Sequence, residues 1–389
     1  MGQTSRVAAA LLVASLGVLA TASPAVAAPE SVTLSASPAI VEFGQITELS
    51  GTISPPTRGE AVVIVDEATG QRVGQATTTG DGTYVLQLTP DRNMRVHAAW
   101  GGKVSLPVDL GVRPGISVSI RDVLLFGTAT ISGHIEPPVD GSVSLTLFRE
   151  GAVATQTDAP VTAGTFSAGL VIARPGSHRA EATFLHESYV PVTATSGTGA
   201  TPLPRLREGS RSVHVRLLEE RLRQLRYRVP SPNARFDHRT GDAVLAFRKV
   251  QGMPRIDTVT SSVWRKLAAP RIPRPRARIP RSHIEVDQTR QVLYVVRDGK
   301  IAHIVHVSTG GPGIGTTRDG VWRVWLKFAG YSPKGLFMPS FFDGGRAIHG
   351  WPDVPPTPAS HGCVRVPNWI APWIYGQISV GSQVRVYHS

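Results

Sequence analysis

The stretch SHGCVR at residues 360–365 follows AIHG at residues 347–350, with ten residues between His349 and Ser360. Cys363 is the only cysteine among 389 residues. An exported protein, which the N-terminus predicts here, normally uses cysteines in pairs as disulfides, so an unpaired thiol needs another explanation. A thiol beside a histidine is typical of a cysteine nucleophile with its general base. The sequence therefore predicts that Cys363 is catalytic.

The N-terminus predicts export. Arg6 precedes an apolar run over residues 7–19, and the small-residue site AVA follows at residues 25–27. This pattern is typical of a secretory signal peptide over residues 1–27, cut after Ala27. The apolar run is shorter than the ~20 residues that span a bilayer. We expect a secreted, extracytoplasmic protein without a stable membrane span after cleavage; a retained signal anchor is the alternative.

Composition favours a mainly β protein with several domains. A chain of this length accommodates roughly two to four domains of about 100–200 residues. The hydrophobic content of 41% permits packed cores, and 39 Gly and 31 Pro with 6% aromatic residues favour turns and short strands over long helices.

The first half of the chain contains an internal repeat with an offset of 82 residues. The recurring pairs are SG at 50–51 and 132–133, PP at 55–56 and 137–138, Gly59 and Gly141, and GTY at 82–84 and GTF at 164–166. Alternating segments bounded by Gly and Pro turns are typical of strands. We predict two Ig-like β-sandwiches, at residues 31–112 and 113–197, that act as spacers or adhesion modules.

A helical period begins after residue 204. The apolar positions are Val215, Leu218, Leu222 and Leu225 on one helix, and Ala243, Val244 and Phe247 on a second. Residues 204–269 resemble the small three-helix peptidoglycan-binding domain found beside cell-wall enzymes, through LREG at 206–209, LRY at 225–227, QG at 251–252 and WRKL at 264–267. The family usually has Gly where Arg226 stands and Gln where Arg248 stands. The resemblance implies binding to the cell wall.

Positive charge is concentrated in one block. Residues 204–283 hold 20 Lys and Arg against 6 Asp and Glu, a net of +14, whereas the whole chain carries +13. The block ends in an Arg/Pro-rich linker at residues 270–282. Such a block suits nucleic acid, membrane headgroups or another polyanion. Export argues against nucleic acid, so we expect anionic cell-wall polymers; a solvated, extended spacer is the alternative.

The C-terminal segment begins with strands. IEVD at 284–287 and VLYVV at 292–296 are strand-like, and residues 297–300 predict a hairpin turn. STG at 308–310, GVW at 320–322 and MP at 338–339 follow, before AIHG at 347–350 and SHGCVR at 360–365. This ordered set, over residues 283–389, resembles the L,D-transpeptidase catalytic domain family. The resemblance implies a β-rich catalytic domain, and the short interval after His349 implies a compact loop over the site.

An ordinary thiol is mostly protonated at neutral pH and becomes a good nucleophile beside an imidazole. The resemblance assigns the base to His349, its other ring nitrogen held by a backbone carbonyl, and not to His361. It places the oxyanion hole at the backbone N–H groups around His361, Gly362 and Cys363. It also implies that Arg365 meets the carboxylate of the donor peptide. The remaining substrate-binding candidates are Ser360 and Met338, and no cofactor or metal is expected.

The implied activity is peptidoglycan L,D-transpeptidation, which contributes to cell-wall organisation and cell shape. An acyl-enzyme forms on Cys363 from a tetrapeptide stem, and an amine on a neighbouring stem resolves it. Water in place of the amine would make an L,D-carboxypeptidase or endopeptidase, and a non-catalytic wall-binding surface protein is a further alternative. For the motif itself, the alternatives are a buried inert thiol and a zinc site. Asp343 and Asp353 are expected in loops.

Overall fold

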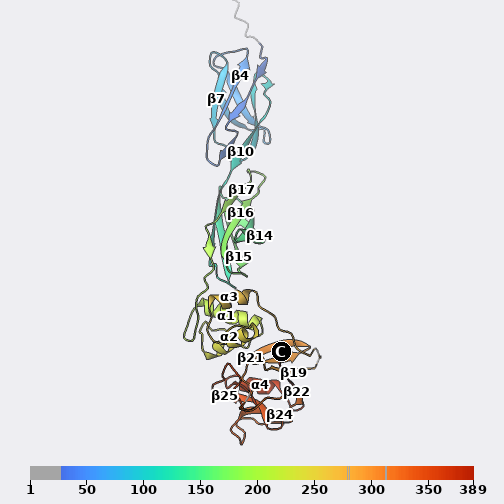
Figure 1. Ribbon diagram of the computed structural model, residues 1–389. Helices are drawn as coiled ribbons and strands as arrows, with labels where there is room; N and C mark the ends of the chain where they lie inside the picture. Colours follow the sequence, from blue (N-terminus) through green and yellow to red (C-terminus); the bar gives the residue numbers. More distant parts are fainter. Residues whose placement is uncertain (1–27, 278, 280, 312) are drawn as a thin grey trace, which may run out of the picture. The chain divides into compact units, whose positions relative to one another are not determined.

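The computed structural model describes residues 28–277, 279, 281–311 and 313–389, so the predicted signal peptide lies outside it. The protein is mainly β, with 45% strand and 11% helix, as predicted (Figure 1). Within the described ranges, no helix is long and apolar enough to cross a membrane. The chain forms two compact units, one with the residues up to 114 and 187–190, the other with 115–186 and 191–389.

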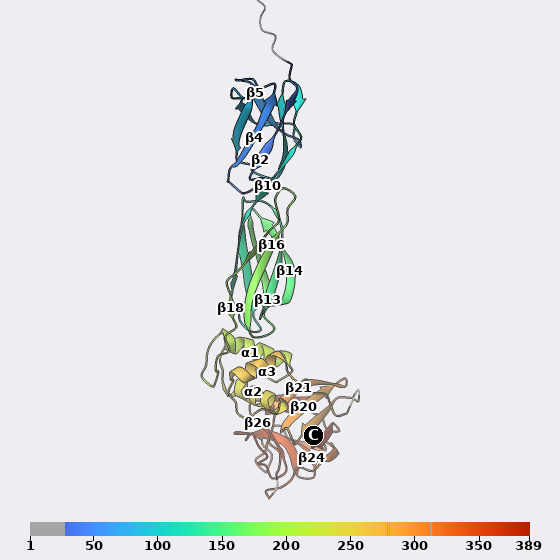
Figure 2. The same cartoon turned by 45° about the horizontal axis from the view of Figure 1, so that its top comes forward.

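The first unit is built from two sheets (Figure 2). Its strands are β1 (Ser31–Val32), β2 (Ser35–Ser37), β3 (Ile40–Glu42), β4 (Thr47–Ser54), β5 (Ala61–Asp66), β6 (Arg72–Thr77), β7 (Thr83–Leu88), β8 (Met94–Trp100), β9 (Lys103–Val104) and β10 (Val108–Arg113). One sheet has the order β1-β4-β2, with β7 on β4; the other has the order β3-β10-β8-β5-β6, with β9 on β8. Apolar side chains such as Leu49 and Ile64 form one core.

The second repeat is a single sheet. Its strands are β11 (Gly115–Arg121), β12 (Thr128–Glu136), β13 (Gly141–Arg149), β14 (Ala152–Thr162), β15 (Thr165–Val171), β16 (Ser177–Phe184), β17 (Val192–Thr195) and β18 (Gly199–Ala200). They pair in the order β11-β12-β15-β14-β13-β16-β17, with β18 on β16. The long strand β14 pairs with β13 along most of its length and with β15 at Val161 and Thr162. The Ig-like assignment of both repeats stays a prediction.

The repeated glycine and aromatic residues have a common packing role. Gly51 on β4 lies opposite Tyr84 on β7, and Gly133 on β12 lies opposite Phe166 on β15. A Cβ atom at Gly51 would come within 2.7 Å of the Tyr84 ring, and one at Gly133 would come within 2.2 Å of the Phe166 ring. Because each ring lies over its glycine, both positions of the pair must recur together.

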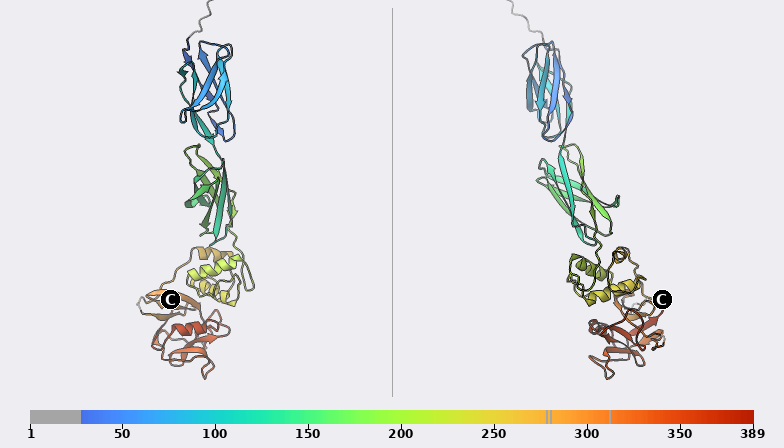
Figure 3. Two further views of the ribbon diagram at one scale, coloured as in Figure 1. Left: turned by 180° about the vertical axis from the view of Figure 1, so that it is seen from behind. Right: turned by 60° about the vertical axis from the view of Figure 1, so that its left-hand side comes forward.

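Three helices occupy residues 204–269, two of them where the apolar period predicts helices and the third as the resemblance to a three-helix domain implies. They are α1 (Val213–Gln224), α2 (His238–Val250) and α3 (Ser261–Ala268) (Figure 3). Ser212 and Asp237 cap α1 and α2, since their side chains accept hydrogen bonds from backbone N–H groups of the first turn. We call this segment the helical domain; its binding to peptidoglycan stays a prediction.

The two departures from the peptidoglycan-binding pattern have structural explanations. Arg226 has φ 72°, in the left-handed region that favours glycine, which accounts for the glycine usual at that position. Arg248 is buried, and its guanidinium donates to the carbonyl oxygens of Pro254 and Thr258 at 2.6 and 3.2 Å. Arg248 therefore holds the loop after α2 and is not part of a wall-contacting surface.

The C-terminal segment forms two sheets and one helix. Its elements are β19 (His283–Asp287), β20 (Val292–Arg297), β21 (Lys300–His306), β22 (Gly320–Arg323), β23 (Leu326–Lys327), β24 (Phe337–Asp343), β25 (Arg346–Trp351), β26 (Val364–Pro367), α4 (Ala371–Gln377) and β27 (Gln383–Tyr387). The sheet orders are β21-β20-β19-β27-β22 and β23-β24-β25-β26. The predicted hairpin turn at residues 297–300 joins β20 to β21.

Strand β20 is buried on both faces. Val292, Tyr294 and Val296 pack into the core of the helical domain, together with Ile304 of β21. Leu293 and Val295 point the other way, into the core between the two C-terminal sheets. The backbone also joins the two parts, because Ile304 N donates to Arg226 O at 2.9 Å and Arg228 N donates to Ile304 O at 3.0 Å. The helical domain and the C-terminal sheets therefore share β20 as common structure.

The Arg/Pro-rich linker is held by hydrogen bonds at its first residues and near its middle. The side chain of Gln251 exchanges two hydrogen bonds with the backbone of Arg271, at 2.8 and 2.9 Å. The carboxylate of Glu285 accepts from the backbone N–H groups of Arg276 and Ala277, at 2.8 and 2.9 Å. These contacts do not fit a free, solvated spacer.

The strained backbone at Arg226 yields a stability prediction. Arg226→Gly should raise the free energy of unfolding by about 1 kcal/mol, because glycine adopts the left-handed region without the Cβ clash. The matched control is Arg226→Ala, which removes the same charge but keeps the clash. Thermal unfolding of both variants measures the difference. Equal stabilisation by Ala and Gly would contradict the backbone explanation.

Candidate active site

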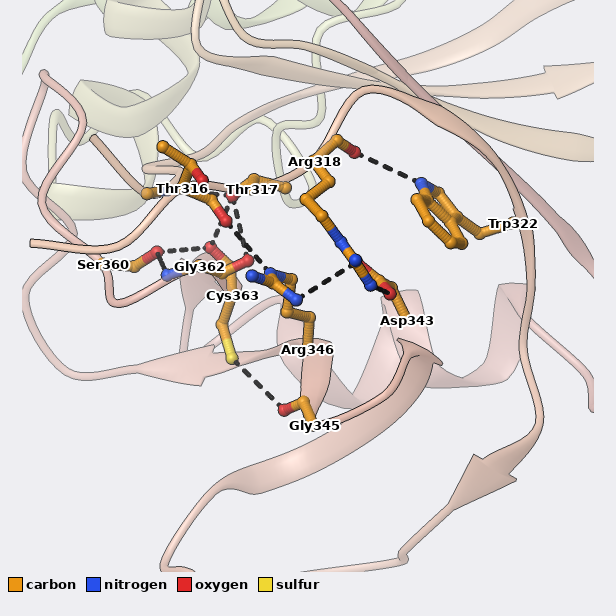
Figure 4. A network of polar contacts seen from close by, with 11 residues as sticks. Thr316, Thr317, Arg318, Trp322, Asp343, Gly345, Arg346, Ser360, Gly362 and Cys363 are labelled. Atoms are coloured by element: carbon orange, nitrogen blue, oxygen red, sulfur yellow. Dashed lines mark hydrogen bonds and ion pairs between the residues drawn. The ribbon is translucent and has the colours of Figure 1, made fainter. Parts of the chain in front are cut away.

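Strands β25 and β26 bring the two motifs together. They pair in parallel, with His349 opposite Arg365 and Ile348 opposite Val364. Ile348 and Val364 point into the core, so His349 and Arg365 project from the other face. Cys363 directly precedes β26, and its Sγ lies 4.0 Å from the carbonyl oxygen of Gly345 (Figure 4). The predicted nucleophile and base therefore come from adjacent strands.

The turn before Cys363 depends on glycine. Gly362 has φ +115°, and a Cβ atom there would lie 2.9 Å from Arg346 Nε and 3.0 Å from Thr316 O. Ser360 is 1% exposed, and its hydroxyl donates to Cys363 O and accepts from Gly362 N at 3.1 Å. The predicted substrate contact of Ser360 is therefore not supported, because its hydroxyl is buried and used within the turn.

Thr309 and Thr317 stabilise this turn through hydrogen bonds to its backbone. Thr317 Oγ1 donates to Gly362 O and accepts from Gly310 N, both at 2.9 Å. The carbonyl oxygen of Thr309 accepts from Ala359 N at 2.9 Å and Ser360 N at 3.0 Å. Sequence reasoning missed Thr317; it noted STG at 308–310 only as part of the family pattern.

His349 is buried and has a defined tautomer. Its Nδ1 lies 2.9 Å from the carbonyl oxygen of Gly350, and a carbonyl oxygen only accepts. Nδ1 therefore carries the proton, and Nε2 is the basic nitrogen. Burial lowers the pKa of His349; the charge of Arg365 acts in the same direction, and the bond to Gly350 opposes it. His349 is thus a neutral imidazole at neutral pH, the form a general base requires.

Cys363 is half-buried, and its resting form is the thiol. Burial raises the pKa of Cys363. The backbone N–H of Ala347 and the charges of Arg365, Arg346 and Lys334 oppose this rise without cancelling it. The two groups at rest are therefore a thiol and a neutral imidazole.

The other predicted residues occupy different places. Arg365 lies over the Trp351 ring at 4.1 Å and donates to Ala359 O at 3.0 Å. His361 is exposed on the turn. Met338 lies in β24, where its backbone N donates to Gly330 O at 2.7 Å and its side chain packs against the core between the C-terminal sheets.

A charged network beside Cys363 escaped sequence reasoning. Asp343 ends β24, is 3% exposed and pairs with Arg318 and with Arg346, the latter at 3.3 Å (Figure 4). Arg346 Nε also donates to Thr316 O at 3.0 Å. Asp343 was expected in a loop, but it ends a strand and orients an arginine that lies over Gly362. The turn DGGR at 343–346 was the only signal in the sequence.

The zinc alternative would require at least three His, Cys, Asp or Glu side chains close together. Among the residues that the structure describes, no group of three His, Cys, Asp or Glu side chains could hold a metal ion.

The sequence model of the L,D-transpeptidase catalytic domain family (YkuD) matches residues 281–386. Similar solved structures include an L,D-transpeptidase from Xylanimonas cellulosilytica, with 31% identity, 48% of this chain and 99% of that chain covered, and a TM-score of 0.46. Another is an L,D-transpeptidase from Stackebrandtia nassauensis, with 26% identity, coverages of 48% and 97%, and a TM-score of 0.30. A search of curated proteins finds no match. Residues 281–386 therefore match the L,D-transpeptidase catalytic domain family.

Proposed function

We propose that the protein is an exported peptidoglycan L,D-transpeptidase that forms cross-links through an acyl-enzyme on Cys363. The observation that carries this proposal is that the adjacent strands β25 and β26 hold a buried, neutral His349 on β25 and a half-buried Cys363 thiol directly before β26. Family membership supports stem peptides of peptidoglycan as the substrates.

In the proposed reaction, Cys363 Sγ attacks the carbonyl carbon of a tetrapeptide stem while His349 Nε2 takes the thiol proton. The tetrahedral intermediate expels the terminal residue, whose amine takes that proton from His349. An amine on a neighbouring stem then attacks the thioester and loses its proton to His349. The C–S bond breaks, and the leaving thiolate takes that proton from His349, which restores the thiol. Arg365 and Arg346 supply positive charge for a substrate carboxylate.

The oxyanion donors need one revision. Gly362 N already donates to Ser360 Oγ, so Gly362 contributes the shape of the turn and not an N–H group. We therefore assign the oxyanion to the backbone N–H groups of His361 and Cys363. Such donors act by stabilising charge that develops only in the transition state.

Hydrolysis of the same thioester would give a carboxypeptidase or endopeptidase. Mass spectrometry of muropeptides from sacculi incubated with the protein separates these outcomes. New cross-linked dimers support the transpeptidase. Shortened stems without dimers would assign the protein to the hydrolytic alternative, and unchanged muropeptides would favour a non-catalytic wall-binding protein.

The nucleophile is tested by Cys363→Ser. The variant should keep its fold and lose nearly all turnover, because a hydroxyl is a far weaker nucleophile beside this base. A carbapenem should add its mass once to the wild-type protein and not to the variant, as measured by intact-protein mass spectrometry. Wild-type cross-linking by the variant would show that another residue attacks.

The two histidines should differ in their pH response. His349→Ala should slow acylation by a β-lactam by on the order of 10²–10⁴-fold at neutral pH, and the rate should recover as pH rises. Because burial raises the pKa of Cys363, that recovery should continue beyond pH 9. His361→Ala should lose rate at every pH, since it disturbs the oxyanion turn. Recovery of His361→Ala alone, measured between pH 6 and 10, would reverse the assignment of the base.

We further propose that the basic block binds anionic wall polymers. A hollow of about 540 Å³ lies between the helical domain, the linker and the turn after β20. Its cations are Arg226, Arg274 and Lys300, none of which takes part in an ion pair within the described residues, and no carboxylate lines it. Deleting the helical domain cannot test this site, because β20 would lose the cover of one face.

Point substitutions provide the test. Arg274→Gln with Lys300→Gln should weaken pelleting with sacculi more than Arg216→Gln with Arg239→Gln, which removes the same charge from the exposed surface of α1 and α2. Binding of the wild type should fall steeply above physiological salt, where the Debye length is about 8 Å. Equal effects of the two pairs would argue against a specific site, and salt-insensitive pelleting would argue against charge.

A further inference from the structure

Lys249 is a buried lysine that the proposed chemistry does not use. It lies near the C-terminal end of α2 and is 3% exposed. Its Nζ contacts three acceptors, His306 Nδ1 at 2.6 Å, Val307 O at 3.0 Å and Gln291 O at 3.1 Å. All three belong to the catalytic domain, so a residue of the helical domain is fully enclosed by its neighbour. A buried polar group without such partners would be costly.

Hydrogen-bond counting fixes the roles within this cluster. His306 Nε2 lies 3.0 Å from Val354 O, which only accepts, so Nε2 carries the proton and Nδ1 is an acceptor. Burial, followed by the charge of Lys249, lowers the pKa of His306 to about 3, so the ring is neutral. Nζ therefore faces three acceptors, which only an ammonium group satisfies completely. Burial, followed by the charge of Arg255, lowers the pKa of Lys249 well below its usual value, and the charge of Asp242 opposes this.

Two routes lead from Lys249 to the turn that carries Cys363. In the first route, His306 accepts from Lys249 and donates to the carbonyl oxygen of Val354, in the loop between His349 and Ser360. Gln291 provides the second, because its side chain exchanges hydrogen bonds of 2.7 Å with Thr309. The carbonyl oxygen of Thr309 in turn accepts from Ser360 N at 3.0 Å.

Two other residues of the helical domain reach the same region. Arg255 donates to Pro356 O at 3.2 Å and to Thr289 O at 2.7 Å. Asp242 on α2 accepts from Trp369 Nε1 at 2.7 Å, beyond the end of β26. The helical domain thus contacts the chain on both sides of Cys363.

We propose that Lys249 is a positioning residue of the active site, which fixes the loop at residues 354–360 and, with it, the turn that carries Cys363. The helical domain is then part of the catalytic unit as well as a wall-binding module. The inference rests on the proposed function only for its kinetic readout, because loop mobility can be measured without activity.

The test is Lys249→Met in the full chain, which keeps most of the side-chain volume and removes the three donors. Amide hydrogen exchange at Ala359 and Ser360, whose N–H groups donate to Thr309 O, should rise at least about tenfold, while amides of α1 keep their protection. Saturating acylation by a β-lactam should slow by on the order of 10–100-fold with little change in the half-saturating concentration, as expected for misplaced groups. Arg239→Met, on the exposed surface of the same helix, is the matched control and should match wild type.

Arg255→Met keeps the proposal testable if Lys249→Met does not fold, because Arg255 is partly exposed. It should raise amide exchange at Thr357, Ala359 and Ser360 without affecting the helices, since Pro355, Pro356 and Pro358 carry no amide N–H. Wild-type exchange and acylation in a folded Lys249→Met protein would overturn the proposal. A uniform rise of exchange across α1, α2 and β20 would also overturn it, since Lys249 would then serve stability alone. Failure of wild-type protein to acylate would reject the proposed function and leave the exchange result interpretable.

Discussion

The burial of β20 on both faces is the constraint on which the catalytic half of this protein depends. One face completes the core of the helical domain through Val292, Tyr294 and Val296, and the other completes the core between the C-terminal sheets. Because burial of apolar surface stabilises each core, neither core is complete without this strand. The backbone bridge at Ile304 and the fixed linker add directional contacts to the same junction.

This junction supports the segments that carry the candidate active site. The turn carrying Cys363 is short, requires glycine at position 362 and uses its own polar groups internally. Its geometry therefore relies on its contacts with Thr309 and Thr317 and on the loop before it. Both are tied to residues that contact α2, whose Lys249 supplies three hydrogen bonds from a buried position. The packing of β20 and the hydrogen bonds of Lys249 thus both join the helical domain to the C-terminal sheets.

The electrostatics of the site follow from its partial burial. Desolvation disfavours charge on both Cys363 and His349, which raises the pKa of the thiol and lowers that of the imidazole. The result is a neutral pair, with cations held nearby by Asp343. In the proposed reaction, this positive charge is available to a substrate carboxylate, and Cys363 becomes a thiolate only as His349 accepts its proton.

The sequence by itself determined the mainly β composition, the helical period at residues 204–269, the hairpin after β20 and the motifs of a cysteine acyltransferase. These features are local, because periodicity, turn residues and motif order require no knowledge of distant contacts. The unbroken apolar run at residues 292–296 also indicated a strand, and two-sided burial explains why its hydrophobicity does not alternate.

Only the tertiary structure decided which groups those elements bring together. The buried hydroxyl of Ser360, the orienting of Arg346 by Asp343 and the enclosure of Lys249 by His306 join residues far apart in the chain or depend on a turn's exact shape. The sequence around an isolated Lys, His or Asp does not indicate which residue it will contact. Their roles arise from burial, which makes each polar group find a specific acceptor or donor.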